Sequence, residues 1–441
     1  MTLNLIEKPR LNQPTIHKLA NGLTIIAEQM PVDAVNLNVW LNVGSAKEAD
    51  EINGMAHFLE HMVFKGTPNL KVGEFEQVIE EKGAITNAAT SQDYTHYYIT
   101  TAPKDLAELA PLQLDVVLNP SLEESAFERE KLVVLEEISR SEDNPGSRSF
   151  YQAMETCFES LPYRRKVLGP AEVIRNLRSQ QMQDFHQSWY QPQSITAAVV
   201  GNLPVDELIE IVSNSFASNY QATNQAELLS PTTPNFAAPS VTVPSVPSVK
   251  AEKPFDKIVR QELTDETLQQ ARLIMMWRVP GMIDLQETYA LDIIAVILGQ
   301  GRVSRLFRDL REEKGLVNRI GVSNMTQTQQ GVFYVSAQLP TENLAEVEKL
   351  IREHLLRFQT ELVASRDIER IRKQVANQFV FANEKPSDRA NLYGYYYSQI
   401  QDLTPALNYP SLIQSISAED LQIAAQKYLN PDAFGIVVMK P

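Results

Sequence analysis

Cysteine is nearly absent from this chain of 441 residues, in which Cys157 is the only one. A single thiol excludes an intramolecular disulfide, a zinc site built from several cysteines and a thiol pair for redox chemistry. Such cysteine usage is typical of a reducing compartment, so the sequence predicts a cytoplasmic protein.

Long apolar runs and an excess of positive charge are missing too. No stretch of about 18 consecutive apolar residues occurs, and residues 1–19 lack the apolar core of a signal peptide, so we expect no membrane association. Lys and Arg number 40 against 55 Asp and Glu, which gives a net charge of −15. This balance disfavours nucleic acid as a partner and suits cationic peptides, although many enzymes are acidic simply to stay dispersed.

The remaining composition is that of a folded protein with more than one domain. Apolar residues make up 43% and charged residues 22% of the chain, whose length exceeds that of one ordinary domain. Residues 230–254, SPTTPNFAAPSVTVPSVPSVKAEKP, contain six prolines. Because proline fixes φ and removes a backbone donor, we expect a semi-rigid linker there. It separates a predicted N-terminal domain, 1–229, from a C-terminal domain, 255–441.

The two predicted domains resemble each other where they end. MQDFHQSWYQPQSITAAVVGN, from Met182, matches LQIAAQKYLNPDAFGIVVMKP, from Leu421, at a constant offset of 239 residues that pairs Trp189 with Tyr428. Each passage indicates a helix, a turn marked by proline and an apolar strand. Strands and helices also alternate elsewhere, so the sequence predicts an α+β protein of two homologous domains that arose by duplication.

A short helix over residues 53–67, NGMAHFLEHMVFKGT, is the first candidate for chemistry, with Asn53 as its predicted N-cap. Successive helical residues turn by about 100°, so His57, Glu60 and His61 share one face. Imidazoles one turn apart can hold one zinc ion. Glu60, beside the second histidine, can then take a proton from a water molecule that the metal polarises, which is the chemistry of amide hydrolysis.

Chance can also place two histidines on one face of an amphipathic helix, and for an isolated pair this would be the better explanation. The glutamate between them and the apolar flanking residues favour the metal site here. A catalytic zinc site then needs a third protein ligand from elsewhere in the chain.

The helix predicted over residues 121–142, SLEESAFEREKLVVLEEISRSE, supplies the candidates for that ligand. Most of its glutamates suit a solvated helix surface, but Glu130 and Glu137 interrupt an apolar stripe, whereas Glu136 points about 100° away. A carboxylate that faces a core needs a cation nearby. We therefore predict Glu137 as the third ligand and Glu130 as a carboxylate that orients a ligand or the substrate.

These segments resemble the pitrilysin and insulinase family of zinc peptidases, in the branch of mitochondrial processing peptidases and their bacterial relatives. The sequence from His57 to His61, HFLEH, matches the family's inverted H-x-x-E-H motif. The family's third ligand lies in a later helix, at a position that Glu137 matches, and its additional active-site glutamate matches Glu130. The resemblance implies one Zn²⁺ per chain, with Glu60 and Glu130 as catalytic residues.

The resemblance extends over essentially the whole chain, including GAITNAATSQDYTHYY at residues 83–98. In the family, the segment matched by Asn87, Ala88, Ala89 and Thr90 is a sheet edge to which the substrate backbone adds as a further strand. Such pairing depends on backbone shape rather than on side chains, which suits a peptidase of broad specificity.

The resemblance also implies an architecture: two homologous domains, each an antiparallel sheet with packed helices, and two chains that close around a chamber for unfolded peptides. Self-sufficient members carry an arginine and, seven residues later, a tyrosine that bind the substrate carbonyl. The matching residues here are Arg311 and Asn318, and asparagine has a shorter reach than tyrosine. We therefore expect a heterodimer with a homologous subunit that carries both the arginine and the tyrosine, with a homodimer as the alternative.

The sequence thus predicts a zinc metalloendopeptidase. Two other classes remain open: a structural subunit that retains the motif as a relic, and a module that binds peptides without cleaving them. Zinc content and a peptide-cleavage assay separate the three.

Overall fold

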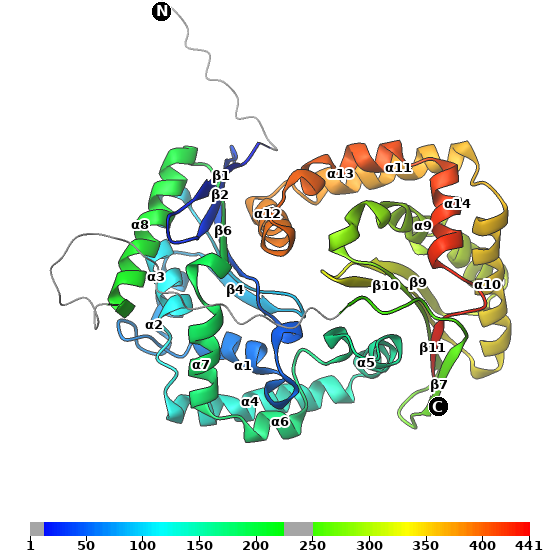
Figure 1. The fold of residues 1–441 in the computed structure, drawn as a ribbon, viewed down its shortest axis with the longest axis horizontal. Coiled ribbons are helices and arrows are strands. Elements are labelled where there is room, and N and C mark those ends of the chain that lie inside the picture. The colour runs from blue at the N-terminus through cyan, green and yellow to red at the C-terminus, as the bar shows by residue number, and fades with distance from the viewer. Residues whose placement is uncertain (1–12, 225–249) are drawn as a thin grey trace, which may run out of the picture. The chain divides into compact units, whose positions relative to one another are not determined.

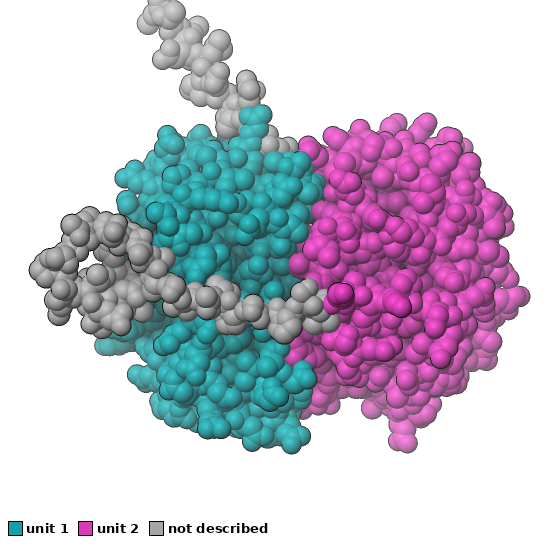
Figure 2. All heavy atoms as spheres, in the orientation of Figure 1, with its two compact units in different colours: residues 1–136, 167–246, 382–407 teal, residues 137–166, 247–381, 408–441 magenta. Residues whose placement is uncertain are grey.

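The computed structural model describes residues 13–224 and 250–441, which form two compact units (Figure 2). Of the described residues, unit 1 combines 13–136, 167–224 and 382–407, and unit 2 combines 137–166, 250–381 and 408–441. Most of the predicted linker, 230–254, lies outside the described residues.

Unit 1 is built on the six-stranded sheet A, with the strand order β1-β2-β6-β3-β5-β4. Figure 1 labels β1, β2, β4 and β6 of this sheet. Its strands are β1 (Thr15–Lys18), β2 (Thr24–Gln29), β3 (Val35–Leu41), β4 (Ile85–Thr90), β5 (Thr95–Thr101) and β6 (Ile195–Gly201). Its helices are α1 (Met55–Val63), α2 (Glu74–Glu81), α3 (Leu106–Leu118), most of α4 (Glu124–Asp143), α6 (Ala171–Asn176), α7 (Ser179–Trp189), α8 (Val205–Asn224) and α12 (Pro386–Ile400). Its short 3-10 turns are η1 (Ser45–Lys47), η2 (Asp50–Ile52), η3 (Pro103–Asp105) and η5 (Pro192–Ser194).

The central strands of sheet A are buried because their sequences are largely apolar. β3 (VNLNVWL) and β6 (ITAAVVG) are buried at every residue. The side-chain amides of both asparagines of β3 donate hydrogen bonds: Asn36 to Thr100 Oγ1 at 2.8 Å, and Asn38 to Asn391 Oδ1 of α12 at 2.6 Å. β4, in contrast, pairs with β5 alone among the described strands and alternates exposed with half-buried residues. It is an edge strand with backbone groups available for a further strand.

Unit 2 is built on the five-stranded sheet B, with the order β7-β11-β8-β10-β9. Its strands are β7 (Val259–Thr264), β8 (Ala271–Pro280), β9 (Arg319–Met325), β10 (Gln330–Leu339) and β11 (Gly435–Lys440). Its helices are α5 (Pro145–Cys157), α9 (Tyr289–Gly299), α10 (Leu344–Thr360), α11 (Ser365–Phe381), most of α13 (Thr404–Ser415) and α14 (Ala418–Tyr428), with the π-helix η7 (Phe307–Glu313) and the 3-10 turns η4 (Pro162–Arg164), η6 (Met282–Glu287) and η8 (Thr341–Asn343). α9, α10, α11 and α14 bury their apolar faces in one core with β8, β10 and β11.

The two sheets are copies of one plan, which confirms the predicted fold of two homologous α+β domains. The order β2-β6-β3-β5-β4 corresponds strand for strand to β7-β11-β8-β10-β9. Neighbouring strands are antiparallel in both sheets, apart from one parallel pair in each: β2 with β6, and β7 with β11. The offset of 239 residues maps both ends of α7 onto both ends of α14.

Each unit also contains one helix from the other half of the sequence. α5 belongs to unit 2, where it packs on β8 and β11, and α12 belongs to unit 1, where it packs on β3 and β6. At Gly394 of α12 a Cβ would lie 2.1 Å from Trp40 Nε1, so only glycine permits this approach to β3. The predicted domain ranges, 1–229 and 255–441, divide the sequence at the linker, whereas the compact units exchange α5 and α12 between the two halves.

Across residues 13–224 and 250–441, no helix combines the length and apolarity needed to cross a membrane.

Candidate metal centre

A buried carboxylate fixes the start of α1, the helix that carries the H-x-x-E-H segment. Glu48 accepts hydrogen bonds from the backbone N–H groups of Gly54 at 2.8 Å and Ala56 at 2.7 Å, which lie at the helix start, where N–H groups have no helical partner. Asn53 was expected to be the N-cap, and that prediction is wrong, because its side-chain amide donates to Glu48 at 2.8 Å. Gly54 occupies the N-cap with a φ of 101°, and a Cβ there would lie 2.6 Å from the carbonyl oxygen of Leu168.

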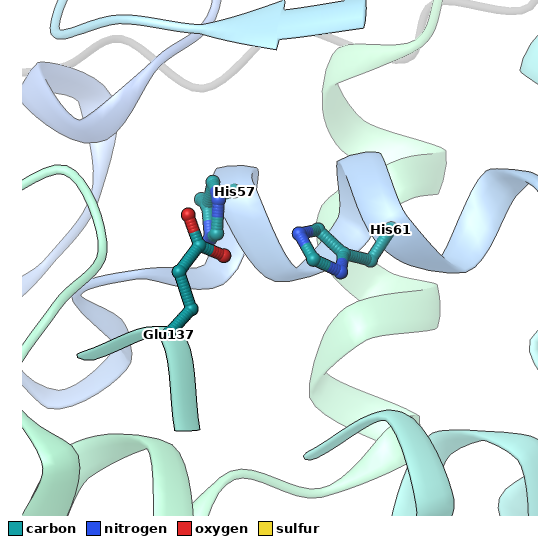
Figure 3. A group of neighbouring side chains, drawn as sticks. All are labelled: His57, His61 and Glu137. Carbon is teal, nitrogen blue, oxygen red and sulfur yellow. The ribbon is translucent and has the colours of Figure 1, made fainter. Parts of the chain in front are cut away.

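His57 and His61 lie one turn apart on α1, and Glu137 comes to the same place from α4. The ligand atoms of these three side chains all lie within 4.8 Å of one another, and the two imidazole centroids are 4.8 Å apart. Figure 3 shows the Glu137 carboxylate beside the ring of His57, with the ring of His61 turned towards both. His57 is buried, whereas His61 and Glu137 are half-buried.

The chemistry of this donor set fits zinc. Two imidazoles and one carboxylate are the protein ligands of a common catalytic zinc site, in which one coordination position stays open. Ligand atoms about 2.0–2.2 Å from one ion lie at most about 4.4 Å apart, so small side-chain rotations would bring the three into one shell. Within the described ranges, this is the one group of three or more His, Cys, Asp or Glu side chains whose ligand atoms all lie within 4.8 Å of one another.

Glu130, two turns before Glu137 on α4, is hydrogen-bonded to one of the two histidines. Its Oε1 lies 3.0 Å from His61 Nδ1, and its Oε2 accepts from Lys65 Nζ at 2.9 Å. Burial raises the pKa of Glu130, but the hydrogen bonds from Lys65 and His61 outweigh this effect and hold the pKa below its ordinary value. An ionised carboxylate on Nδ1 orients the imidazole and leaves Nε2 for a metal.

Glu60 is half-buried on α1 and is tied to the edge strand of sheet A. Its Oε2 accepts a hydrogen bond from Thr90 Oγ1 at 2.5 Å, and Thr90 is the last residue of β4. Close enough for the charge of Glu60 to act on them, Tyr97 and Tyr190 share a hydrogen bond of 2.8 Å between their hydroxyl oxygens. Burial raises the pKa of Tyr97, and the charges of Tyr190 and Glu60 raise it further. The predicted base therefore accepts a hydrogen bond from the strand edge and lies within electrostatic reach of a neutral phenol pair.

The predicted substrate-binding residues lie in both units. Asn87, Ala88, Ala89 and Thr90 lie on β4, where Asn87 and Ala89 are exposed. Arg311 and Asn318 belong to unit 2. Arg311 is exposed on η7, with its guanidinium 4.7 Å from the ring centroid of Phe307, and the exposed Asn318 donates its backbone N–H to Gln338 at 2.8 Å just before β9. Their part in substrate binding stays a prediction.

The helical rotation used in the sequence analysis predicted which glutamates of α4 face the solvent. In the structure Glu136 is exposed, Glu137 is half-buried and Glu130 is 9% exposed. Sequence reasoning missed Glu48 and Lys65. Lys65 had a signal, because it lies four residues after His61 and four residues form about one helical turn. Glu48 had none, because it acts on α1 from a loop outside the helix.

Comparisons with known proteins agree with this geometry. A family model described as Insulinase (Peptidase family M16) matches residues 23–171, and one described as Peptidase M16 inactive domain matches residues 176–375. The chain belongs to the insulinase family of M16 peptidases. His57, His61 and Glu137 all fall within the first matched segment.

Several similar proteins match nearly the full chain. An uncharacterized zinc protease of Rickettsia felis is 27% identical over 413 residues, which are 93% of this chain and 94% of the relative. The zinc protease PqqE of Helicobacter pylori is 25% identical over 427 residues, 96% of this chain and 92% of the relative. The crystal structure of a protease from Helicobacter pylori has a TM-score of 0.86 and 26% identity, and the match covers 98% of this chain and 100% of that one.

Proposed function

We propose that this M16 chain is a zinc metalloendopeptidase that hydrolyses unfolded peptides. The observation that carries the proposal is the meeting of His57, His61 and Glu137, with Glu60 on the same helix as the two histidines. The relatives are named zinc proteases, which supports the proposal.

In this proposal His57, His61 and Glu137 hold one Zn²⁺, which when bound makes water more acidic and polarises the scissile carbonyl. Glu60 takes the proton of the attacking water and passes it to the leaving amine nitrogen. Its hydrogen bond from Thr90 orients the carboxylate towards β4. Glu130 and Lys65 keep His61 in the ring orientation that a ligand needs.

The substrate in this proposal is an extended peptide that adds to β4 alongside Asn87, Ala88, Ala89 and Thr90. β4 is an edge strand of sheet A, so its outer backbone groups suit such pairing. Only a chain without its own secondary structure can offer a free strand, which accounts for the preference for unfolded peptides. Glu60 hydrogen-bonds to the end of this same strand, which supports cleavage of a peptide lying there.

We expect the active form to be a dimer around a chamber, with Arg311 and Asn318 as substrate-binding residues of the second half. Because Asn318 is shorter than tyrosine, oxyanion support would come from a homologous companion with the arginine and tyrosine together, and a homodimer is the alternative. Losing one oxyanion donor typically costs about 10²–10³ in turnover, so the companion would raise activity markedly. A cytoplasmic location completes the proposal.

The test measures zinc and cleavage on the same protein. The purified chain should bind one zinc per chain and cleave an unstructured peptide, with activity lost to a chelator and restored by zinc. Addition of a homologue that carries the arginine and tyrosine should raise the rate. A chain that binds zinc and peptide but never cleaves, with or without the homologue, would be a binding module, and a chain without zinc would be a structural relic.

A further inference from the structure

Two arginines lie side by side on one face of sheet B in unit 2. In the strand register, Gln338 of β10 pairs with Arg272 of β8 on one side and with Arg319 of β9 on the other. Directly paired residues of antiparallel strands point to the same face of a sheet. The row Arg272–Gln338–Arg319 therefore presents two guanidinium groups around one side-chain amide.

This row lines a hollow of about 360 Å³ that lies between the strands and the start of α5. The other polar groups in the hollow are the hydroxyls of Ser149, Tyr334 and Ser336. Phe150 and Tyr334 add an aromatic wall, with ring centroids 6.3 Å apart. No carboxylate is among the described residues that line it.

The two arginines of the hollow have no carboxylate in an ion pair with them among the described residues. Arg148 is nearby, but it is satisfied, because its Nε donates to Asp265 Oδ2 at 3.0 Å. Neither Arg272 nor Arg319 forms an ion pair with any residue in the described part of the chain. Burial lowers the pKa of Arg272, and repulsion from Arg148 and Arg319 lowers it further, although the charge of Asp265 opposes this shift in part.

The side-chain amide of Gln338 is a hydrogen-bond partner of Arg272. In the amide orientation that hydrogen bonding favours, its oxygen accepts from both terminal nitrogens of Arg272 at 3.0 Å. This oxygen is a neutral acceptor, so it orients the guanidinium without neutralising it. Arg319 is exposed and has no comparable partner among the residues described.

A second hollow of unit 2 shows the contrast. That hollow, of about 470 Å³, also contains cations, but they are paired: Lys440 Nζ lies 2.6 Å from Glu262 Oε2, and Arg260 pairs with Glu348. Cations that already have carboxylate partners do not call for an anionic ligand. The unpaired arginines set the first hollow apart, in a chain whose net charge is −15.

We propose that the hollow of Arg272, Gln338 and Arg319 binds a carboxylate of the peptide substrate, either an acidic side chain or the C-terminal carboxylate. Guanidinium groups match carboxylates through two parallel hydrogen bonds, and the aromatic wall suits the apolar parts of a peptide. This inference rests on the proposed peptidase function for the identity of the ligand. It makes unit 2 a determinant of which peptides bind.

The experiment measures binding without cleavage, in the full chain loaded with zinc and carrying Glu60→Gln. Fluorescence anisotropy gives the Kd of three labelled unstructured peptides of equal length. The first has acidic residues and a free C-terminus, and the second has Asn or Gln in place of the acidic residues but keeps the free C-terminus. The third has neither acidic residues nor a free C-terminal carboxylate, because its C-terminus is amidated. Arg272→Gln/Arg319→Gln should raise the Kd of the carboxylate-bearing peptides by about tenfold or more and leave the fully neutral peptide unchanged. The control pair Arg366→Gln/Arg370→Gln removes the same charge from exposed positions of α11 and should change nothing.

Arg319→Glu provides a second variant, because Arg319 is exposed and its replacement spares the core. It should weaken the acidic peptide at least as much as the double variant does. Equal weakening of all three peptides, or none, would overturn the proposal. Inorganic phosphate that binds the hollow without competing with the acidic peptide would overturn it too, in favour of a free-anion site. If the binding pattern holds but the chain with Glu60 intact cleaves nothing, the peptidase proposal fails while the carboxylate site stands.

Discussion

α1 and α9 occupy corresponding places in the two units but have different surroundings. Each follows a central strand, β3 or β8, and precedes the hairpin that ends the sheet, β4–β5 or β9–β10. In α9, YALDIIAVILG, nine of the 11 residues are buried and none is histidine or glutamate. In α1, MAHFLEHMV, Glu60 and His61 remain partly exposed beside β4. The fold requires only an apolar helix here, which supports the proposal that the polar residues of α1 serve chemistry.

Two later helices, α4 in the first half and α11 in the second, differ in the same way. The offset of 239 residues carries Glu137 of α4 onto Ala376 of α11, and Glu130 onto Glu369, which is exposed. The second half thus retains the scaffold without the proposed ligand set. If this comparison is right, substitutions in the first half should affect zinc and catalysis, whereas their counterparts in the second half should affect stability alone.

The largest expected effect is that of Glu60→Gln. The amide cannot take a proton, so kcat should fall by up to about 10⁴, while His57, His61 and Glu137 still bind zinc stoichiometrically. Cleavage of an unstructured peptide and metal analysis of the same sample measure both quantities. A glutamine variant with near-normal turnover would show that another group is the base.

The next effect separates two neighbours on α4. Glu137→Ala should weaken zinc binding by more than about 100-fold, because it removes a ligand rather than an outer partner. Glu136→Ala is the matched control and should leave affinity unchanged, since Glu136 is exposed. Competition with a chelator of known affinity gives both values, and similar losses in the two variants would disprove the assignment of Glu137.

A third prediction concerns the one carboxylate of α9. Burial raises the pKa of Asp292 to about 6, although hydrogen bonds from Asn324 and Tyr409 oppose this shift. Between about pH 4 and 6 the folded protein therefore holds a proton that the unfolded chain releases, so the stability that this group contributes is full below about pH 4 and falls as pH rises. The loss should reach about 3 kcal/mol above pH 6.

Asp292→Asn removes this titration. The unfolding free energy of the native chain, measured against that of the variant in urea, should therefore decline by about 3 kcal/mol between pH 4 and pH 7. Asp256→Asn, at an exposed position of unit 2, is the control and should show no such trend. A difference that stays constant with pH would mean that Asp292 ionises as readily when folded as when unfolded.

The sequence indicated much of this because helical periodicity is local. The spacing of His57, Glu60 and His61 and the stripe of Glu130 and Glu137 follow from rotation about one axis, and the duplication is visible as an offset. Other features depend on contacts between distant segments. The periodicity of α12 does not predict that this helix packs on sheet A. The row of Arg272, Gln338 and Arg319 likewise forms only when three strands pair in the observed register.

The smallest effect tests whether the carboxylate beside His61 distinguishes the two halves. Glu130→Ala should weaken zinc binding by about 10–100-fold, because the variant loses the acceptor that orients the imidazole. Lys65→Met, which removes the other partner of Glu130, should weaken it by less than about tenfold, because the contact between Glu130 and His61 survives.

Glu369→Ala is the control from the second half, where the corresponding glutamate on α11 is exposed. It should leave zinc affinity unchanged. The three variants therefore form a series in which the loss of affinity follows proximity to His61, measured by the same chelator competition. If Glu369→Ala weakened zinc as much as Glu130→Ala, the loss would reflect general destabilisation, and the hydrogen bond to His61 would have no specific part in metal binding.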